Sequence, residues 1–398
     1  MLHRSIQLSI VSAAAVITLI ATDMMLPSLP HIMTFFGVSA NEVKMLLSFF
    51  MLGQFCTVLP WGIITDHLGK SKAMLLGMIG FFIGSLLSLI DHSIYLLFFA
   101  RFIQGASSIV VPVAGWALIQ DLYPKKEGIN ALAKVSMLTA IVPLFAPFVG
   151  GLLDKNFGWR SSFYCIALGA FLLCLIFSVL PRPSLPEKKP LASLKSRWAV
   201  YGLILKNRTF LSYVALFGVF NCGEWCFLTV APFYYASKGM DSANIGFLLT
   251  LTSIGFVMGS FLTPKLLALW GMDKLINNSI FLAFLSSVFM LMGDQLHWFA
   301  VPWFSALIFS IYLTGSALLW SCTTSQALAC FEGHKGAASA VRCLLMLCFA
   351  FLGTFMGRIM PHNTLLASGF LLLATAMAAF MLFNQSSFKK IRLLNEST

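Results

Sequence analysis

Charged side chains are scarce in this sequence. Of its 398 residues only 10% are Asp, Glu, Lys or Arg, while 59% are hydrophobic. Soluble domains carry about 25% charged residues. So large a deficit excludes a soluble enzyme, and it excludes a nucleic-acid-binding protein despite the net charge of +12. The apolar runs are continuous rather than alternating, which excludes a transmembrane β-barrel as well. The sequence predicts an all-α polytopic membrane protein.

Also missing are the residue groups that hydrolyse ATP, bind a metal or catalyse a reaction at a membrane face. No G-x-x-x-x-G-K-[ST] signature is present, so an ATP-driven pump is excluded. The seven histidines are scattered, and the nine cysteines lie almost wholly in apolar segments, where we interpret them as packing residues. We therefore expect no enzyme activity, no metal and no cofactor, and active transport would have to draw on a gradient.

The apolar segments are long enough to cross a membrane many times. A helix that crosses a bilayer needs about 20 mostly apolar residues. The chain contains twelve such segments, and the connections between them leave no room for a soluble domain. They cover 6–33, 43–65, 73–91, 94–118, 132–153, 161–181, 209–236, 243–264, 275–293, 299–326, 336–359 and 363–385.

The basic residues predict which side each connection faces. Of the 26 lysines and arginines, twenty fall on the side that holds the N-terminus, five on the other, and Arg101 lies inside a span. Arg342, near the start of the segment 336–359, is counted with the first group. Because cytoplasmic connections are rich in Lys and Arg, both termini are expected in the cytoplasm.

The longest connection, residues 182–208, divides the spans into two sets of six. The prolines in 181–190 oppose a continuous helix, and the basic residues keep the segment cytoplasmic. We expect one six-helix bundle over 1–181 and another over 209–398. Such halves would be parallel repeats around a site near the bilayer midplane.

Two acidic residues lie deep in apolar sequence, whereas the other twelve fall in connections or at span ends. Asp23 lies near the middle of the first span, where Pro27 and Pro30 loosen the helix that follows it. Glu224 lies near the middle of the seventh span. Burying a carboxylate in a membrane costs at least about 2.5 kcal/mol, so each acid needs a function or a partner. Asp23 either carries protons and cationic substrate or pairs with Arg101 to lock helices, and Glu224 is either a second carrier or a neutral packing residue.

Arg101 belongs to the polar segment of the fourth span. Gln104 follows it by one helical turn, and Gly105 is expected to permit the close approach of another helix. Arginine keeps its charge when buried, so Arg101 could hold a nearby acid ionised or drive off its proton.

The connection between the second and third spans carries small and charged residues that could form a gate at the cytoplasmic mouth. They are Gly62, Asp66, Gly69 and Lys70. Gly62 is expected to allow tight packing there. The fifth span carries two prolines and a pair of glycines, which form either a gating hinge or an ordinary packing face. They are Pro143, Pro147, Gly150 and Gly151.

The seventh span also holds aromatic and amide side chains around Glu224. They are Asn221, Trp225, Phe227, Phe233 and Tyr234. We predict that they line a substrate cavity suited to bulky apolar compounds, including cations. The alternative is that they pack helices together or face lipid.

Taken in this order, these segments resemble the major facilitator superfamily, and within it the twelve-span drug:proton antiporters of the Bcr/CflA type. The segment from Asp23 to Pro30 resembles that subfamily's D-x-x-x-P-x-x-P. Residues 62–70 resemble the superfamily's G-x-x-x-D-R-x-G-R/K loop, Arg101 to Gly105 fits R-x-x-q-G, and 146–151 resembles the antiporter motif. The resemblance is clear over the first half of the chain and fainter in the second.

The resemblance implies the major facilitator fold, with twelve helices in two pseudo-symmetric bundles that rock to give alternating access. It implies Asp23 as the proton and cation site, with Arg101 and Gln104 as its modulators. It further implies a monomer in the bacterial inner membrane that exports small amphipathic drugs in exchange for protons. A carrier of one physiological solute, such as a siderophore, amino acid or sugar, and running even as a symporter, stays open. A membrane-embedded sensor or enzyme is the remote alternative.

Overall fold

A computed structural model of the protein describes residues 2–90, 93–123, 125–179, 194–296, 298, 301–331 and 335–384. The chain divides into two compact units, residues 1–191 with 239–250 and residues 192–238 with 251–398. The predicted bundle boundaries at 181 and 209 stay predictions. The short segment 239–250, which precedes and begins a helix of the second half, belongs to unit 1.

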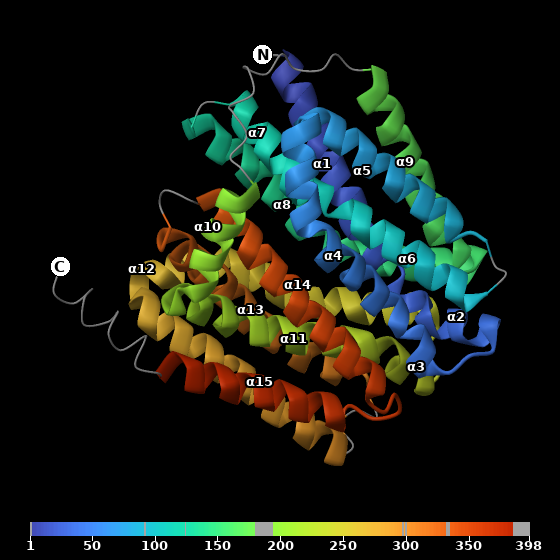
Figure 1. The fold of residues 1–398 in the computed structure, drawn as a ribbon. Coiled ribbons are helices and arrows are strands. Elements are labelled where there is room, and N and C mark those ends of the chain that lie inside the picture. Colours follow the sequence, from blue (N-terminus) through green and yellow to red (C-terminus); the bar gives the residue numbers. More distant parts are fainter. Residues whose placement is uncertain are drawn as a thin grey trace. The chain divides into compact units, whose positions relative to one another are not determined.

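Unit 1 is built from helices joined by short turns. They are α1 (Leu2–Asp23), η1 (Leu26–Ser28), α2 (Leu29–Phe36), α3 (Ala40–Val43), α4 (Met45–Leu68), α5 (Lys70–Leu87), α6 (Ile94–Ser108), η2 (Val111–Gly115), α7 (Trp116–Leu122), α8 (Lys125–Phe157) and α9 (Arg160–Val179). Helices α4, α5 and α6 pack side by side, and α1 packs against α8 and α9 (Figure 1).

The helices of unit 2 gather around α11. They are α10 (Leu194–Lys206), α11 (Arg208–Ser237), α12 (Ser242–Gln295), α13 (Trp303–Ala329), α14 (Lys335–Ile359) and α15 (Leu366–Asn384). Helix α11 packs against α13, α14 and α15 (Figure 1). Helix α10 occupies part of the predicted linker 182–208, whereas the proline-rich stretch of that linker, 181–190, lies outside the described residues.

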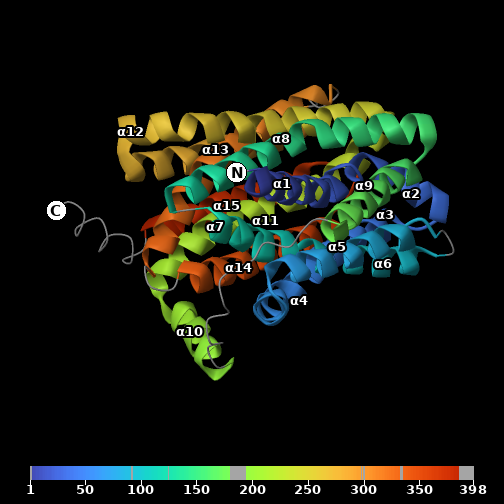
Figure 2. The same cartoon turned by 90° about the horizontal axis from the view of Figure 1, so that it is seen from above.

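The predicted spans agree with the helices. Eleven helices among the described residues are long and apolar enough to cross a membrane. One of them, Ser242–Gly293, is 52 residues long and contains the two predicted spans 243–264 and 275–293. The backbone leaves the helical conformation at Gly271 (φ 72°, ψ 172°), a conformation that favours glycine. The arms 251–270 and 272–295 turn back along one another there (Figure 2). Counted on both sides of this kink, the spans are the twelve that were predicted.

Large apolar side chains cover much of the helix surface. Tyr95, Phe157 and Val179 are 72%, 75% and 82% exposed. Such exposure is unfavourable in water but costs little against lipid tails. The all-helical membrane fold is therefore confirmed.

Candidate functional site

Asp23 is the last residue of α1, at a break in the first span. The prolines that follow explain the break, because Pro27 has no N–H to donate to the carbonyl of Asp23. The chain continues as a 3-10 turn, Leu26–Ser28, and then as α2. The predicted loosening of the helix after the acid is confirmed. The Asp23 side chain is half-buried, and no described side chain forms a hydrogen bond or an ion pair with its carboxylate.

Arg101 is the centre of a buried hydrogen-bond network that joins α1, α5 and α6. Its Nη1 donates to the carbonyl oxygen of Ala21 at 3.0 Å and to Oε1 of Gln104 at 2.8 Å. The amide nitrogen of Gln104 donates to Oγ of Ser85 at 2.9 Å. The guanidinium also lies 4.4 Å from the centroid of the Phe50 ring, in cation–π geometry. Arg101, Gln104 and Ser85 are all 0% exposed, so water does not share these contacts.

The network brings Arg101 to the turn of α1 that carries Asp23, but through the backbone. Among the described residues, Arg101 makes no ion pair within 4.0 Å, and its Nε and Nη2 are buried without a hydrogen-bond partner. The alternative in which an Asp23–Arg101 ion pair locks the helices is therefore absent from this conformation. Within the described residues, Asp23 therefore lacks a side-chain partner, and Arg101 on α6 contacts the same turn of α1 while two of its nitrogens stay unpaired, which is an arrangement that a proton or a ligand can change.

Two glycine residues allow close helix contacts, one at the turn of Asp23 and one at Phe50, beside Arg101. A Cβ atom on Gly105 would overlap the carbonyl group of Phe50, and a Cβ atom on Gly150 would overlap the carbonyl group of Met24. The predicted close approach at Gly105 is confirmed. Helix α8 therefore presses on the residue directly after Asp23, and α6 presses on the residue that stacks on Arg101.

The predicted packing face of the fifth span lies on α8, which runs unbroken through Pro143 and Pro147. A Cβ atom on Gly151 would overlap the carbonyl group of Ser242, at the start of α12. A Cβ atom on Gly246 would likewise overlap the carbonyl group of Pro147. The glycine pair thus provides close backbone contacts, whereas its predicted role as a hinge stays a prediction.

The predicted cytoplasmic gate residues surround the turn between α4 and α5. Gly69 has φ 85° and ends α4, so that α5 begins at Lys70. The Lys70 ammonium donates to Oδ2 of Asp121 at 2.5 Å and to the carbonyl of Ala117 at 3.1 Å, which ties α5 to α7. Asp66 is exposed. The expected tight packing at Gly62 is wrong, because no atom of the described part of the chain lies within 4 Å of a Cβ placed there.

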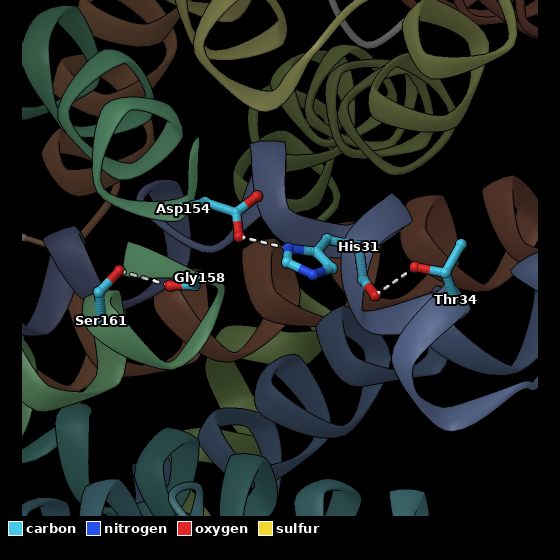
Figure 3. Close-up of polar contacts among 5 residues, drawn as sticks. All are labelled: His31, Thr34, Asp154, Gly158 and Ser161. Carbon is cyan, nitrogen blue, oxygen red and sulfur yellow. Dashed lines mark hydrogen bonds and ion pairs between the residues drawn. The ribbon is translucent and has the colours of Figure 1, made fainter. Parts of the chain in front are cut away.

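Unit 1 also contains a buried acid whose position suggested a span end. Asp154 lies in α8 and is 3% exposed. Its Oδ1 is 2.8 Å from Nδ1 of His31 on α2, while its Oδ2 is buried and has no hydrogen-bond partner among the described residues (Figure 3). The next residue, Lys155, forms an ion pair of 2.8 Å with Asp241. The two residues of the His31–Asp154 pair are 123 positions apart, so no local pattern could have predicted it.

Glu224 in unit 2 accepts a hydrogen bond from a hydroxyl group of a neighbouring helix. Oγ of Ser316 on α13 donates to Oε2 of Glu224 at 3.4 Å, and the carboxylate is half-buried. One turn earlier on α11, the amide of Asn221 donates to the carbonyl of Met346 at 3.0 Å. Polar contacts on two neighbouring helices therefore hold this part of α11.

The aromatic residues predicted to line a cavity are covered by neighbouring helices. Phe227, Phe233 and Tyr234 are 0%, 2% and 1% exposed. The ring of Phe227 stacks on that of Phe309 at 3.7 Å. Only Trp225 and Asn221 of the predicted set are half-buried. A ligand could reach the other three only after the helices of unit 2 had moved, so their role in binding stays a prediction.

Arg342 was counted with the basic residues on the side of the N-terminus, and Arg101 alone was placed inside a span. The count by sides stays a prediction, but the second statement is wrong, because Arg342 also lies inside a span. It lies in α14, inside the candidate span Gly336–Ile359. Its Nη2 donates to Oγ1 of Thr324 at 2.5 Å, and its guanidinium stacks on Trp320. Arg342 was not recognised as an intramembrane cation because it lies near the start of the predicted segment 336–359 and no acid close to it in sequence marks a site. The excess of basic residues on the side of the N-terminus remains without it.

Helices long enough to cross a membrane, two helical units and intramembrane charges define a polytopic membrane transporter. The family model of the Major Facilitator Superfamily matches residues 11–343, so the chain belongs to that superfamily. Its members are transporters, not enzymes.

Relatives support the same class. The chain is 26% identical over 369 residues to the uncharacterised MFS-type transporter YdgK of Bacillus subtilis strain 168, with 91% of this chain and 90% of that protein covered. It is 27% identical over 332 residues to the multidrug resistance protein MdtL of Shewanella sp. strain ANA-3, with 82% of each covered. It is 26% identical over 275 residues to a bicyclomycin resistance protein homologue of Haemophilus influenzae, with 68% of each covered.

The fold has solved counterparts as well. A crystal structure of a D-xylose–proton symporter matches with a TM-score of 0.76 at 14% identity, covering 95% of this chain and 96% of that one. At this identity the match concerns the fold alone.

Proposed function

We propose that this protein is a proton-coupled exporter of small amphipathic compounds across the bacterial inner membrane, working by alternating access. The proposal is supported by the relatives named for multidrug and bicyclomycin resistance and by a third named for chloramphenicol resistance, from Acinetobacter baumannii. Both termini would be cytoplasmic because basic connections stay on that side. The protein would act as a monomer and need no cofactor besides the proton gradient.

The observation that carries the proposal is the turn at Asp23. Its carboxylate lies at a helix break with no described partner, while Arg101 holds the same turn through the carbonyl of Ala21. A carboxylate can hold a proton or a cationic substrate, and binding one disfavours the other. This competition would couple export to proton entry. Arg101 would modulate it through its charge near the acid, and Gln104 by holding the guanidinium in place.

The remaining predicted residues would complete the cycle. Glu224 would be a second proton or substrate site, next to Asn221 and Trp225. The contact of Lys70 with Asp121 would open and close with the inner mouth, in the loop that also holds Asp66. The glycine face of α8 would allow helices to slide past one another, because backbones that touch directly carry no interlocking side chains.

The test is uptake of ethidium into inside-out proteoliposomes under an imposed pH gradient, because this geometry turns export into uptake. We expect the wild type to accumulate ethidium. The initial uptake rate of Asp23→Asn should be lower by a factor of about ten or more, since an amide cannot take up the proton. Asp241→Asn is the matched control. It removes one acid outside the spans and should leave the rate unchanged.

Two results would contradict parts of the proposal. A folded wild type without gradient-driven uptake of ethidium or of chloramphenicol would favour a carrier dedicated to one physiological solute. Unchanged coupling in Asp23→Asn would make Asp23 a structural residue, and Glu224→Gln would then be the variant to examine.

A further inference from the structure

Arg342 is a cation placed well inside unit 2. It lies seven residues after Lys335, where α14 begins, which corresponds to about 10 Å along the helix axis. On the predicted topology this end of α14 is cytoplasmic. An exporter takes up its cargo from that side, so Arg342 lies at a depth that cargo reaches first.

The surroundings of Arg342 combine a hydroxyl group with an aromatic surface. The guanidinium carbon is 4.4 Å from the centroid of the Trp320 ring, and Nη2 donates to Oγ1 of Thr324 at 2.5 Å. The rings of Phe217 and Trp320 meet edge to face, with centroids 4.8 Å apart and planes at 71°. The indole is thereby held between two helices, while 38% of Trp320 stays exposed.

The charge of Arg342 is not neutralised within the described residues. No acidic side chain there lies within 4.0 Å of it, and Thr324 takes only one of the five N–H donors of the guanidinium. Locking α14 to α13 would require only a neutral donor, and an ionised group in a membrane span is costly. A planar fork of free donors beside an exposed indole matches a carboxylate carried by an aromatic ring.

We propose that Arg342, Thr324 and Trp320 form a substrate-binding subsite that takes the negatively charged group of an aromatic compound. The guanidinium binds the anionic group, Thr324 holds the guanidinium in place, and the exposed part of Trp320 packs against the ring. This proposal depends on the proposed export function in one respect, namely that the ligand of the subsite is a transported compound. It widens the range of cargo from cations, which Asp23 would attract, to aromatic anions and zwitterions.

The test compares two probes of one shape, 2-naphthoate and the neutral 2-naphthamide. Their affinities for the purified full-length protein in micelles are measured by equilibrium dialysis. We expect the wild type to bind naphthoate about tenfold more tightly than naphthamide, since hydrogen bonds to charged groups are the stronger ones. Arg342→Gln should abolish this preference. Arg358→Gln, which removes a cation near the other end of α14, is the matched control and should keep it.

Equal affinity of the wild type for the two probes, or an undiminished preference in Arg342→Gln, would overturn the subsite. If Arg342→Gln does not fold, Thr324→Val decides. Loss of the hydroxyl should lower the preference severalfold, and an unchanged preference there would overturn the proposal. Adding phosphatidylglycerol to the micelles separates cargo from lipid, because abolition of the preference by this lipid would assign the guanidinium to lipid headgroups instead.

Failure of the subsite and failure of the export function give different results. A wild type that accumulates ethidium but does not distinguish the two probes loses only the subsite. A wild type that prefers naphthoate but accumulates no compound under a pH gradient loses only the export function.

Discussion

The interactions that hold the helices together inside unit 1 differ from those inside unit 2. In unit 1 a buried guanidinium, an amide and a hydroxyl connect α6 with α1 and α5. In unit 2 the corresponding interior is a stack of rings from α11 and α13. Phe227 stacks on Phe309 at 3.7 Å, Phe309 on Tyr312 at 5.6 Å and Tyr312 on Phe220 at 5.3 Å.

The difference shows how each unit solves the same problem. Lipid tails are as apolar as a helix surface, so the hydrophobic effect does not drive helices together inside a membrane. Close packing and hydrogen bonds must do so. The polar network of unit 1 also fixes the position of a charge next to Asp23, whereas the ring stack of unit 2 fixes shape and carries no charge. The two units should therefore respond differently to small substitutions.

The largest effect is expected where a backbone contact supports the polar network. Gly105→Ala places a methyl group against the carbonyl of Phe50, whose ring lies under Arg101, and a backbone cannot move aside alone. We expect a loss of about 3 kcal/mol, at the upper end of the range for overpacking. Gly223→Ala meets the hydroxyl of Tyr312 instead, which can shift, so about 1 kcal/mol is expected. Thermal unfolding in micelles measures both.

Gly62→Ala is the matched control, because nothing lies within 4 Å of the added atom. Its unfolding midpoint should equal or slightly exceed that of the wild type, because alanine is favoured over glycine inside a helix. A Gly105→Ala protein as stable as Gly62→Ala would show that α4 and α6 can separate without cost, and the network would then not depend on their contact.

A smaller effect is expected from single polar groups. Gln104→Leu removes the acceptor of Arg101 and the donor to Ser85, so a buried charge loses a partner, and about 2 kcal/mol should be lost. Tyr312→Phe keeps the ring stack and removes only the hydroxyl, which contacts the carbonyl of Phe220 and Thr375. Hydrogen bonds between membrane helices average about 0.6 kcal/mol, which is the loss expected here.

The order of the unfolding temperatures of these two variants tests the comparison between the two units. If Tyr312→Phe unfolded at a lower temperature than Gln104→Leu, the hydroxyl contacts and not the rings would hold unit 2. Double substitution should give the sum of the two losses, since the two sites lie in separate units and share no partner.

Much of this arrangement could be predicted because it depends on local sequence. Long apolar runs define the spans, and Pro27 ends α1 at Asp23 because it lacks the donor that the next turn would need. Gly105 was recognisable as a contact point because a small residue next to polar ones rarely faces lipid. Each of these features requires only residues within a few turns of one another.

The pairings could not be predicted in the same way. Lys70 reaches Asp121, 51 residues away, and His31 reaches Asp154 across 123 residues. Which helices become neighbours, and how each is rotated, decides such contacts. For the same reason Gly62, though part of a recognisable motif, turned out to face open space. Whether Asp23 and Glu224 carry protons depends on motion and stays a prediction.

The smallest effect is expected at the ion pair of Lys155 with Asp241, next to the buried Asp154. The Lys155 side chain, and then the N–H of Asn244, hold the pKa of Asp241 below its usual range. A lowered folded-state pKa means that the pair stabilises the protein above the unfolded pKa of about 3.9 and stops doing so as the pH falls through the folded value.

Both side chains are more than a third exposed, at 53% and 39%, so Lys155→Met should cost at most about 0.5 kcal/mol at pH 7. The difference in unfolding midpoint between the wild type and Lys155→Met should shrink below about pH 4. In proteins that also carry Asp241→Asn, which lacks the titrating acid, Lys155→Met should produce no difference in midpoint. A difference that stays constant down to pH 3 would show that Lys155 stabilises α8 through its aliphatic chain, and that even this exposed contact of unit 1 depends on packing rather than charge.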